Sequence, residues 1–123
     1  MANHREIALR SIAVGDIFHG TCPNGASLIC LVISVTEATI HARRVTTQED
    51  IEFDRELGVE RSGDGRVLAT IDSVAPLPAD IHEVMLGLDR RYRFGHGLER
   101  LKLTDVEKRA FSFIHDYYPS NRL

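Results

Sequence analysis

Hydrophobic and polar positions along residues 15–75 follow the patterns of short β-strands. Residues 28–36 form an almost continuous apolar run rich in β-branched side chains, which is typical of a strand covered on both faces. Residues 51–54 alternate apolar and acidic side chains, which predicts a strand with one dry and one wet face. The strands are expected near residues 16–22, 28–36, 39–46, 51–54 and 66–74. Five such strands favour a small antiparallel barrel or a strongly bent sheet, since closure hides exposed edges.

Turn residues separate these segments. Pro23-Asn24-Gly25 follows the first expected strand, and the loop assigned to residues 55–65 ends in Ser62-Gly63-Asp64-Gly65. Asp-Gly is among the strongest hairpin signals, because both central positions of a type I′ turn need positive φ. Residues 1–14 are weakly patterned, and the candidate anchors within them are Ile7, Leu9 and Ile12.

The periodicity becomes helical after Pro76. One helix is expected near residues 79–93, because apolar residues recur on one helical face at Ile81, Val84, Met85, Leu88 and Tyr92. A second is expected near 104–117, where Thr104-x-x-Glu107 has the form of a capping box. Its apolar stripe consists of Val106, Ala110, Phe113, Ile114 and Tyr117. Phe111 and Tyr118 fall to one side of that stripe, which favours a homodimer through the last helix.

The predicted fold class is α+β: an N-terminal five-stranded antiparallel small barrel or bent sheet, followed by two C-terminal helices. We expect one domain over residues 1–123, with a barrel part at 15–75 and a helical part at 76–120 packed on it. Gly15-Asp16-Ile17-Phe18 leads into the first of the five strands, and this arrangement resembles SH3-like or Sm-like barrels by architecture. The expected core residues are Ile17, Ile29, Leu31, Ile33, Val67, Val84, Met85, Leu88, Phe113 and Ile114.

Composition narrows the classes of function. Hydrophobic residues make up 43% and charged residues 27%, which is ordinary for a globular protein. A net charge of −3 excludes a generally basic nucleic-acid coat, although a local basic site is still compatible with it. A membrane helix needs about 20 apolar residues, and the longest apolar run is much shorter. With no export signal visible, we expect a cytoplasmic protein without a membrane partner.

Metal and catalytic motifs are weak in this sequence. His19, Cys22, Cys30 and His41 are residue types that zinc prefers, but His19 and Cys22 point to opposite faces of a strand. No metal and no cofactor are therefore expected. The inferred hairpin separates Cys22 from Cys30 by more than a disulfide spans, so both thiols should be free. Motifs for a serine nucleophile, a phosphate loop or a zinc protease are absent, and no catalytic residue is assigned.

Charge is arranged in two blocks, an acidic one at residues 49–60 and a basic one at residues 90–102 in which aromatic residues are interleaved. Arginine beside aromatic side chains suits phosphate or acidic partners. The predicted partner-binding residues are Arg90, Arg93, His96, Arg100 and Lys102.

The leading hypothesis is a non-enzymatic small binding or regulatory module with a partner surface near residues 90–102. The partner is a protein or a nucleic acid. Three alternatives stay open. The basic block can be a solvated helix end, or one neutralised by the acidic block. The protein can be a small enzyme acting on an anionic substrate through His96 and the nearby arginines. It can also be a structural homo-oligomer.

Overall fold

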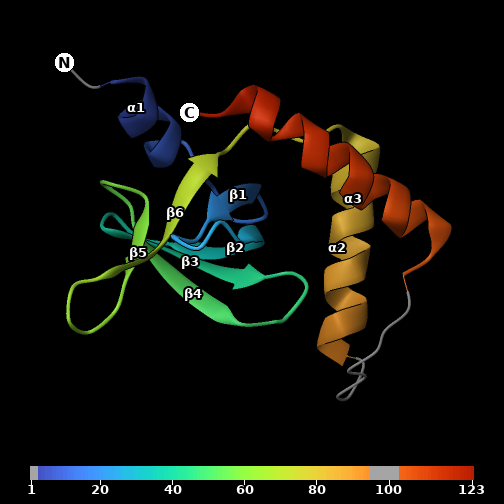
Figure 1. Cartoon of the computed structure of the whole chain (residues 1–123), viewed down its shortest axis with the longest axis horizontal. Coiled ribbons are helices and arrows are strands. Elements are labelled where there is room, and N and C mark those ends of the chain that lie inside the picture. The colour runs from blue at the N-terminus through green and yellow to red at the C-terminus, as the bar shows by residue number, and fades with distance from the viewer. Residues whose placement is uncertain (1–2, 95–102) are drawn as a thin grey trace.

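The computed structural model describes residues 3–94 and 103–123. A short helix precedes six strands, and two longer helices and a 3₁₀ turn follow them (Figure 1). The elements are α1 (His4–Arg10), β1 (Ile17–Thr21), β2 (Ser27–Val35), β3 (Thr39–Arg44), β4 (Asp50–Asp54), β5 (Val59–Arg61), β6 (Val67–Ser73), α2 (Ala79–Phe94), α3 (Asp105–Tyr117) and η1 (Pro119–Asn121).

The strands form one antiparallel sheet in the order β4-β3-β2-β1-β6-β5, curled into a nearly closed barrel. Its two outer strands, β4 and β5, lie next to each other and leave a seam. The predicted α+β class is confirmed, but the predicted count of five strands is wrong. The sixth strand, β5, lies inside the segment assigned to a loop. It has three residues, too few to show an alternating pattern, and Gly58 at φ +71° precedes it.

Helix α1 closes one end of the barrel. The segment was expected to be weakly structured, but Asn3 caps the helix by accepting a hydrogen bond from the Glu6 N–H at 2.8 Å. Of the three anchors considered, Leu9 and Ile12 are buried, whereas Ile7 is 56% exposed. The helix therefore contributes its C-terminal part to the core.

One arginine ties the end of α1 to the barrel. The Arg55 guanidinium donates to the carbonyls of Thr36 at 2.7 Å, Arg10 at 2.8 Å and Ile12 at 3.0 Å, and more weakly to that of Leu9 at 3.4 Å. Carbonyls at a helix C-terminus have no partner within the helix. Arg55 satisfies them and fixes the segment that leads into β1.

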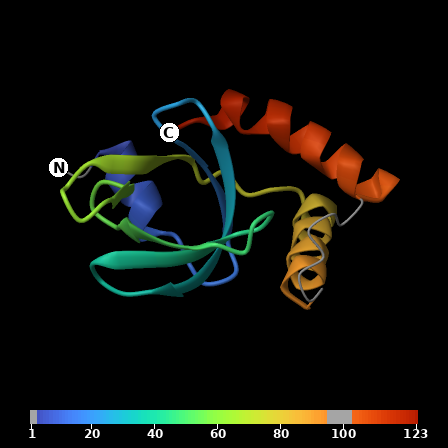
Figure 2. The ribbon, with the colours of Figure 1, turned by 60° about the horizontal axis from the view of Figure 1, so that its bottom comes forward.

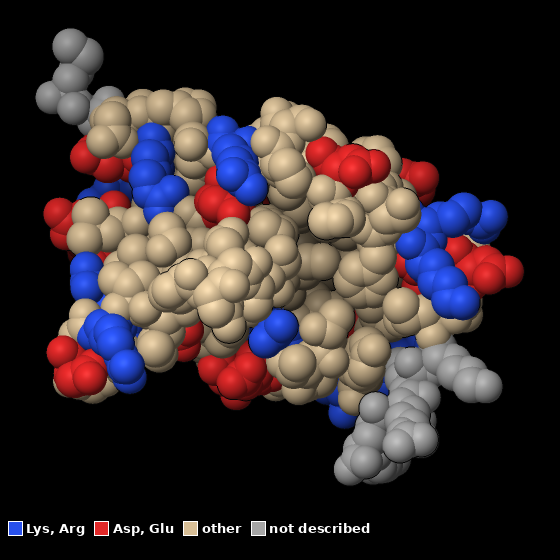
Figure 3. Space-filling view, viewed as in Figure 1, with Lys and Arg blue, Asp and Glu red and all other residues tan. Residues whose placement is uncertain are grey.

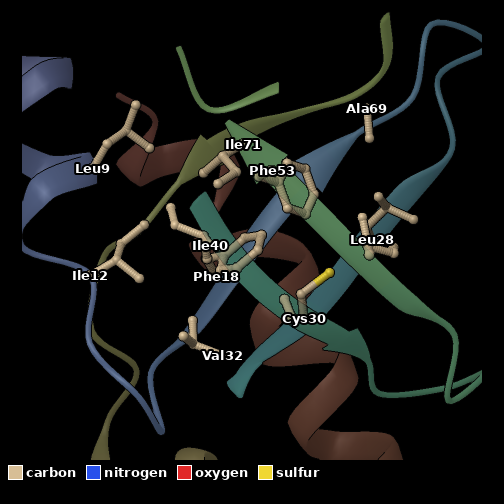
Figure 4. Close-up of a cluster of buried hydrophobic side chains, with 12 residues drawn as sticks. Leu9, Ile12, Phe18, Leu28, Cys30, Val32, Ile40, Phe53, Ala69 and Ile71 are labelled. Carbon is tan, nitrogen blue, oxygen red and sulfur yellow. The ribbon is translucent and has the colours of Figure 1, made fainter. Parts of the chain in front are cut away.

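The molecule has two hydrophobic cores. The first fills the barrel, where the rings of Phe18 and Phe53 meet edge to face with centroids 5.3 Å apart (Figure 4). The second lies between the outer face of β1–β2 and the two long helices, and it contains Ile17, Leu31 and the fully buried Tyr118. Since neighbouring residues point to opposite faces, β1 and β2 serve both cores. The prediction that residues 28–36 form a strand covered on both faces agrees with this arrangement.

Both long helices lie on one side of the barrel, and α3 runs from α2 back to it, so that the C-terminus lies beside the strands (Figure 2). The Leu123 N–H donates to the Asp72 carbonyl at 2.9 Å. The predicted capping box is present: Thr104 accepts from the Glu107 N–H, and the Glu107 carboxylate accepts from the Thr104 N–H at 2.8 Å. In the part of the chain that the structure describes, no helix is both long and apolar enough to cross a membrane.

An ion pair joins α2 to the barrel. Arg43 on β3 donates to both carboxylate oxygens of Asp89 on α2, at 3.0 and 2.8 Å. Gln48 donates a further bond of 2.9 Å to Asp89 and one of 2.9 Å to the Val45 carbonyl, and it does so from a left-handed backbone conformation with φ 64°. The Asp89 side chain is nearly inaccessible to solvent.

The prediction of core residues is confirmed for the residues at the centre of the core and is wrong for one flank of α3. Five expected core residues are buried, namely Ile17, Leu31, Met85, Leu88 and Ile114. Four others are only partly buried, namely Ile29, Ile33, Val67 and Val84. Phe113 is 37% exposed, and Val106 on the same predicted stripe is 51% exposed.

The reason is that α3 docks through Ala110, Ile114 and Tyr118, one face at four-residue spacing, which leaves one flank of its wide apolar stripe in solvent. Tyr118, which we expected on the surface, has no exposed area, and Phe111 is partly buried against the same core. Tyr118 therefore does not contribute to the surface on which the homodimer was argued, and Phe111 is only partly exposed there. The oligomeric state itself stays a prediction.

Candidate functional site

The described part of the predicted basic surface lies at the C-terminal end of α2. Arg90 and Arg93 are exposed there, and the Arg93 guanidinium sits 5.3 Å from the centroid of the Phe94 ring, which is itself 64% exposed. Arg91 points elsewhere and forms an ion pair with Glu107 of α3. His96, Arg100 and Lys102 fall outside the described residues, so their place in a partner surface, and a catalytic role for His96, stay predictions.

The acidic block does not neutralise the described end of the basic block. Among residues 3–94 and 103–123, no ion pair joins Arg90 or Arg93 to residues 49–60. Glu49 instead lies 4.0 Å from Arg44 on the neighbouring strand. Burial raises the pKa of Asp89, but the hydrogen bonds from Arg43 and Gln48 and the charge of Arg43 lower it below its ordinary value, and the charge of Arg93 makes a smaller contribution in the same direction.

A second site lies between the barrel and the last helix, where a cleft of about 560 Å³ separates the outer face of β1–β2 from α3. That size suits a small organic molecule. Figure 3 shows a hollow between the barrel and the helices with walls that carry few charged side chains. The lining is apolar at Ile29, Phe111 and Ile114, and polar at His19, Ser27, Ser112 and His115.

Strand register explains why these side chains meet. His19 on β1 faces Ile29 on β2, and Thr21 faces Ser27, so all four lie on the same face of the sheet. Phe18, one position along, points into the barrel core instead. Helix α3 supplies the opposite wall with residues 111–115.

His19 is held in place by Asp72 on β6. The two are 2.6 Å apart, from imidazole Nδ1 to one carboxylate oxygen, and Thr21 donates its hydroxyl to the other oxygen. The imidazole also lies against the ring of Tyr118, with centroids 5.2 Å apart. Because Asp72 accepts at Nδ1, that nitrogen carries the proton, and Nε2 stays available for a ligand. Within the described ranges, nothing forms a hydrogen bond with Nε2.

The titratable groups around His19 are held in fixed roles. Burial raises the pKa of Tyr118, so its hydroxyl stays protonated and donates to the Ile17 carbonyl at 3.4 Å. On the opposite face of the sheet, burial raises the pKa of the Cys30 thiol to about 12, which makes it unreactive. Both oxygens of Asp72 are already engaged. The cleft therefore offers hydrogen-bond donors and apolar walls, and the Asp72 carboxylate beside His19 is already paired.

The arrangement can bind and orient a ligand, but a nucleophile next to the histidine is not formed. Neither Ser27 nor Ser112 forms a hydrogen bond with His19, which a serine nucleophile activated by a base would need. In the described ranges no three His, Cys, Asp or Glu side chains gather as metal ligands would, and Cys22 and Cys30 are free thiols.

Sequence reasoning considered His19 only as a zinc ligand and missed its pairing with Asp72. The two residues are 53 positions apart, on strands that become neighbours only when the barrel closes. The one available signal in the sequence was the alternation of side chains along β1, which places His19 and Phe18 on opposite faces of the sheet.

Comparison with known protein families, with curated protein sequences and with solved structures finds no significant match. The resemblance to SH3-like barrels therefore stays one of architecture, and function must be argued from the sites themselves.

Proposed function

We propose that this protein is a small binding module that holds an organic carboxylate in the cleft between β1, β2 and α3. The observation that carries the proposal is the His19–Asp72 pair in a cleft with apolar walls. When the imidazole carries both protons, Nδ1–H donates to Asp72 and Nε2–H is left to donate to an anionic ligand. Two serine hydroxyls and His115 offer further donors.

The expected affinity is modest. Burying one phenyl ring against Ile29, Phe111 and Ile114 contributes about 2–3 kcal/mol. A charge-assisted hydrogen bond from His19 adds about 1.5–3 kcal/mol. Part of this sum is lost because the ligand gives up its freedom of motion, so we expect a Kd of about 0.1–1 mM for a minimal ligand. A natural ligand that fills the cleft should bind more tightly.

The test compares 3-phenylpropionate with its neutral amide, followed by NMR chemical shifts and calorimetry. We expect the acid to bind at least tenfold more tightly and to shift residues of β1, β2 and α3. His19→Gln should abolish this preference. His41→Gln is the matched control, because His41 also lies near an aspartate, Asp50 at 3.4 Å, but is far from the cleft lining. Equal binding of acid and amide, or no binding at millimolar concentration, would contradict the proposal.

The basic end of α2 supports a second binding function, the one expected from sequence. Arg90, Arg93 and Phe94 are exposed together, which suits an anionic partner. Binding of a short single-stranded or duplex oligonucleotide, or of an acidic peptide, should weaken as salt rises. The double substitution of Arg90 and Arg93 by alanine should weaken it, and Arg66→Ala, another exposed arginine, should not. Binding that is insensitive to both salt and the double substitution would refute this function.

A further inference from the structure

A further groove lies at the start of β1 and shares no lining residue with the two proposed binding sites. Its larger part is a cleft of about 200 Å³ lined by the end of α1, the start of β1 and the segment that links β6 to α2. Its smaller part is a cleft of about 90 Å³ that reaches His82 on α2. Asp16, Ile17, Val74 and Pro76 line both clefts, so the two lie next to each other. We call them together the β1 groove.

The walls of the groove suit an aliphatic chain. In the larger cleft every lining residue except Ser11 and Asp16 is apolar, and Leu77 adds an apolar side chain in the smaller one. Apolar walls with a few polar groups are typical of pockets for small organic molecules. No lysine or arginine of residues 3–94 and 103–123 lines either cleft. The Ser11 hydroxyl already donates to the Ile7 carbonyl at 2.9 Å, so its oxygen can only accept a further hydrogen bond.

A β-bulge at the start of β1 positions Asp16. Gly15 and Asp16 together oppose Val32 on β2: the Gly15 N–H donates to the Val32 carbonyl at 3.0 Å, and the Val32 N–H donates to the Asp16 carbonyl at 2.8 Å. Gly15 has φ +92°, a conformation that favours glycine as the first residue of such a bulge. The extra residue interrupts the regular alternation of β1 at Asp16. Bulges are common next to functional sites, where they re-aim a side chain.

The Asp16 carboxylate has a free oxygen and no cation partner among the described residues. One oxygen, Oδ2, accepts from the Ala13 N–H at 2.8 Å, which fixes the side chain in the loop before β1. In the described ranges Oδ1 accepts no hydrogen bond, and no lysine, arginine or histidine lies within ion-pair distance. An exposed carboxylate that lines an apolar cleft favours a positively charged ligand and repels an anionic one. The net charge of −3 attracts cations to the protein as well.

These features together select a cation with an aliphatic chain. We propose that the β1 groove binds a primary alkylammonium group, with its chain against the apolar walls of the larger cleft and its ammonium group at the Asp16 carboxylate. An ammonium group donates up to three hydrogen bonds. The side-chain acceptors in the groove include the Asp16 carboxylate, the Ser11 oxygen and, when it is neutral, the His82 imidazole. Both a free aliphatic amine and a lysine side chain carry this chemistry.

The first experiment follows binding of n-pentylamine by NMR chemical shifts at pH 7, where an amine with a pKa close to that of lysine, about 10.4, is protonated. We expect shifts at residues 11–18 and 74–77. 1-Pentanol keeps the chain without the charge and should bind at least fivefold more weakly, because charge-assisted hydrogen bonds are roughly twice as strong as neutral ones. Ammonium chloride keeps the charge without the chain and should also bind at least fivefold more weakly. Pentanoate reverses the charge and should shift none of these residues.

A capped peptide with a single lysine between glycines distinguishes the two sources of the ligand. Tighter binding of the peptide would assign the groove to a lysine side chain of a partner protein. Tighter binding of n-pentylamine would assign it to a free amine. Both results support an alkylammonium site.

Two substitutions test the charge and the cleft separately. Asp16→Asn removes the charge but keeps an oxygen that can accept from the Ala13 N–H, and it should weaken binding of n-pentylamine at least fivefold. Ala8→Leu keeps the charge and fills the larger cleft, so it should weaken binding to a similar extent. Asp105→Asn is the matched control, because Asp105 is also exposed but lines neither cleft. Thermal unfolding shows whether each variant is folded, and if one of the first two does not fold, the other decides the test.

Four results would each overturn the proposal. They are equal binding of n-pentylamine and 1-pentanol, equal effects of Asp16→Asn and Asp105→Asn, tighter binding of pentanoate than of the amine in the groove, and no shifts at millimolar amine concentration.

Discussion

Replacing Asp89 by alanine should destabilise the fold by about 3–5 kcal/mol, because it leaves a mostly buried arginine without its counter-ion. Asp89 accepts three hydrogen bonds, two from Arg43 and one from Gln48. Only 12% of the Arg43 side chain and 4% of the Asp89 side chain are exposed. Without the carboxylate, the guanidinium stays desolvated and unpaired, which costs more than the hydrogen bonds themselves.

Two further substitutions separate charge from packing. Asp89→Asn keeps the shape and one acceptor oxygen but loses the charge, so it should cost about 1–3 kcal/mol. Changing the pair together, with Arg43→Met and Asp89→Leu, removes both desolvation costs. This double variant should regain most of the stability that Asp89→Ala loses.

The pair also predicts a dependence of stability on pH. Burial alone would raise the pKa of Asp89, but the hydrogen bonds from Arg43 and Gln48 outweigh burial, so the pKa is lower than the ordinary value. A carboxylate with a lowered pKa in the folded state stabilises fully above its unfolded value, about 3.9. That contribution is lost as pH falls through the folded pKa. Stability should therefore decline below about pH 4 in the unchanged protein, and less steeply in Asp89→Asn.

Urea unfolding followed by circular dichroism, between pH 3 and pH 7, measures these differences as long as the m-value stays constant. A loss below 1 kcal/mol for Asp89→Ala would refute the reasoning. So would a double variant that is as unstable as Asp89→Ala. In either case, α2 would be held to the barrel by its apolar face alone.

Three further predictions test other parts of the fold. Tyr118→Ala should lower the free energy of unfolding by about 3–5 kcal/mol, since the side chain is fully buried between the barrel and α3, whereas Tyr118→Phe should lower it by about 1 kcal/mol. Thermal unfolding measures both changes, and an unchanged Tm for the alanine variant would contradict the burial. Arg55→Ala should lower the free energy of unfolding by about 2–3 kcal/mol and should speed amide hydrogen exchange in α1 more than in β2. An equal increase of exchange in both elements would show that the arginine does not anchor α1. Gly58→Ala should be clearly worse than Gly15→Ala: both sit at positive φ, but only at Gly58 would the new Cβ meet other atoms, 2.7 Å from the Arg5 side chain and 3.0 Å from that of Leu9. Equal Tm values for these two variants would refute the steric part of that comparison.

Local chemistry made most of the barrel predictable. β2 has a long β-branched run, and Gly65 before β6 has a φ of +85°, a conformation that few other residues adopt. Asp64 does not have the positive φ that a type I′ turn needs, so the turn type expected from Asp-Gly is wrong although the hairpin is present. β5 could not be predicted in the same way, because its three residues acquire their strand conformation from pairing with β6. The helix of residues 4–10 is also short, and its stability comes from Leu9 in the core and from Arg55 at its end.

The candidate site was much less predictable than the fold. The side of α3 that docks was ambiguous, because its apolar residues form a wide stripe and only contact with the barrel selects Ala110 and Ile114 over Phe113. The pairing of His19 with Asp72 depends on β1 and β6 becoming neighbours. A sequence pattern reports which face a residue occupies, but it does not report which distant residue meets it there.

The order of the strands also has a consequence for how the chain folds. Every ladder except β1–β6 joins strands that follow each other along the chain, so most of the barrel can assemble from hairpins with little loss of loop entropy. Pairing of β6 with β1 closes the one long loop, and the contact between His19 and Asp72 forms at that step. We therefore expect β1–β6 closure to limit the folding rate. A compound that binds to the His19 cleft would recognise only chains that have completed this step, and it would slow unfolding without accelerating folding.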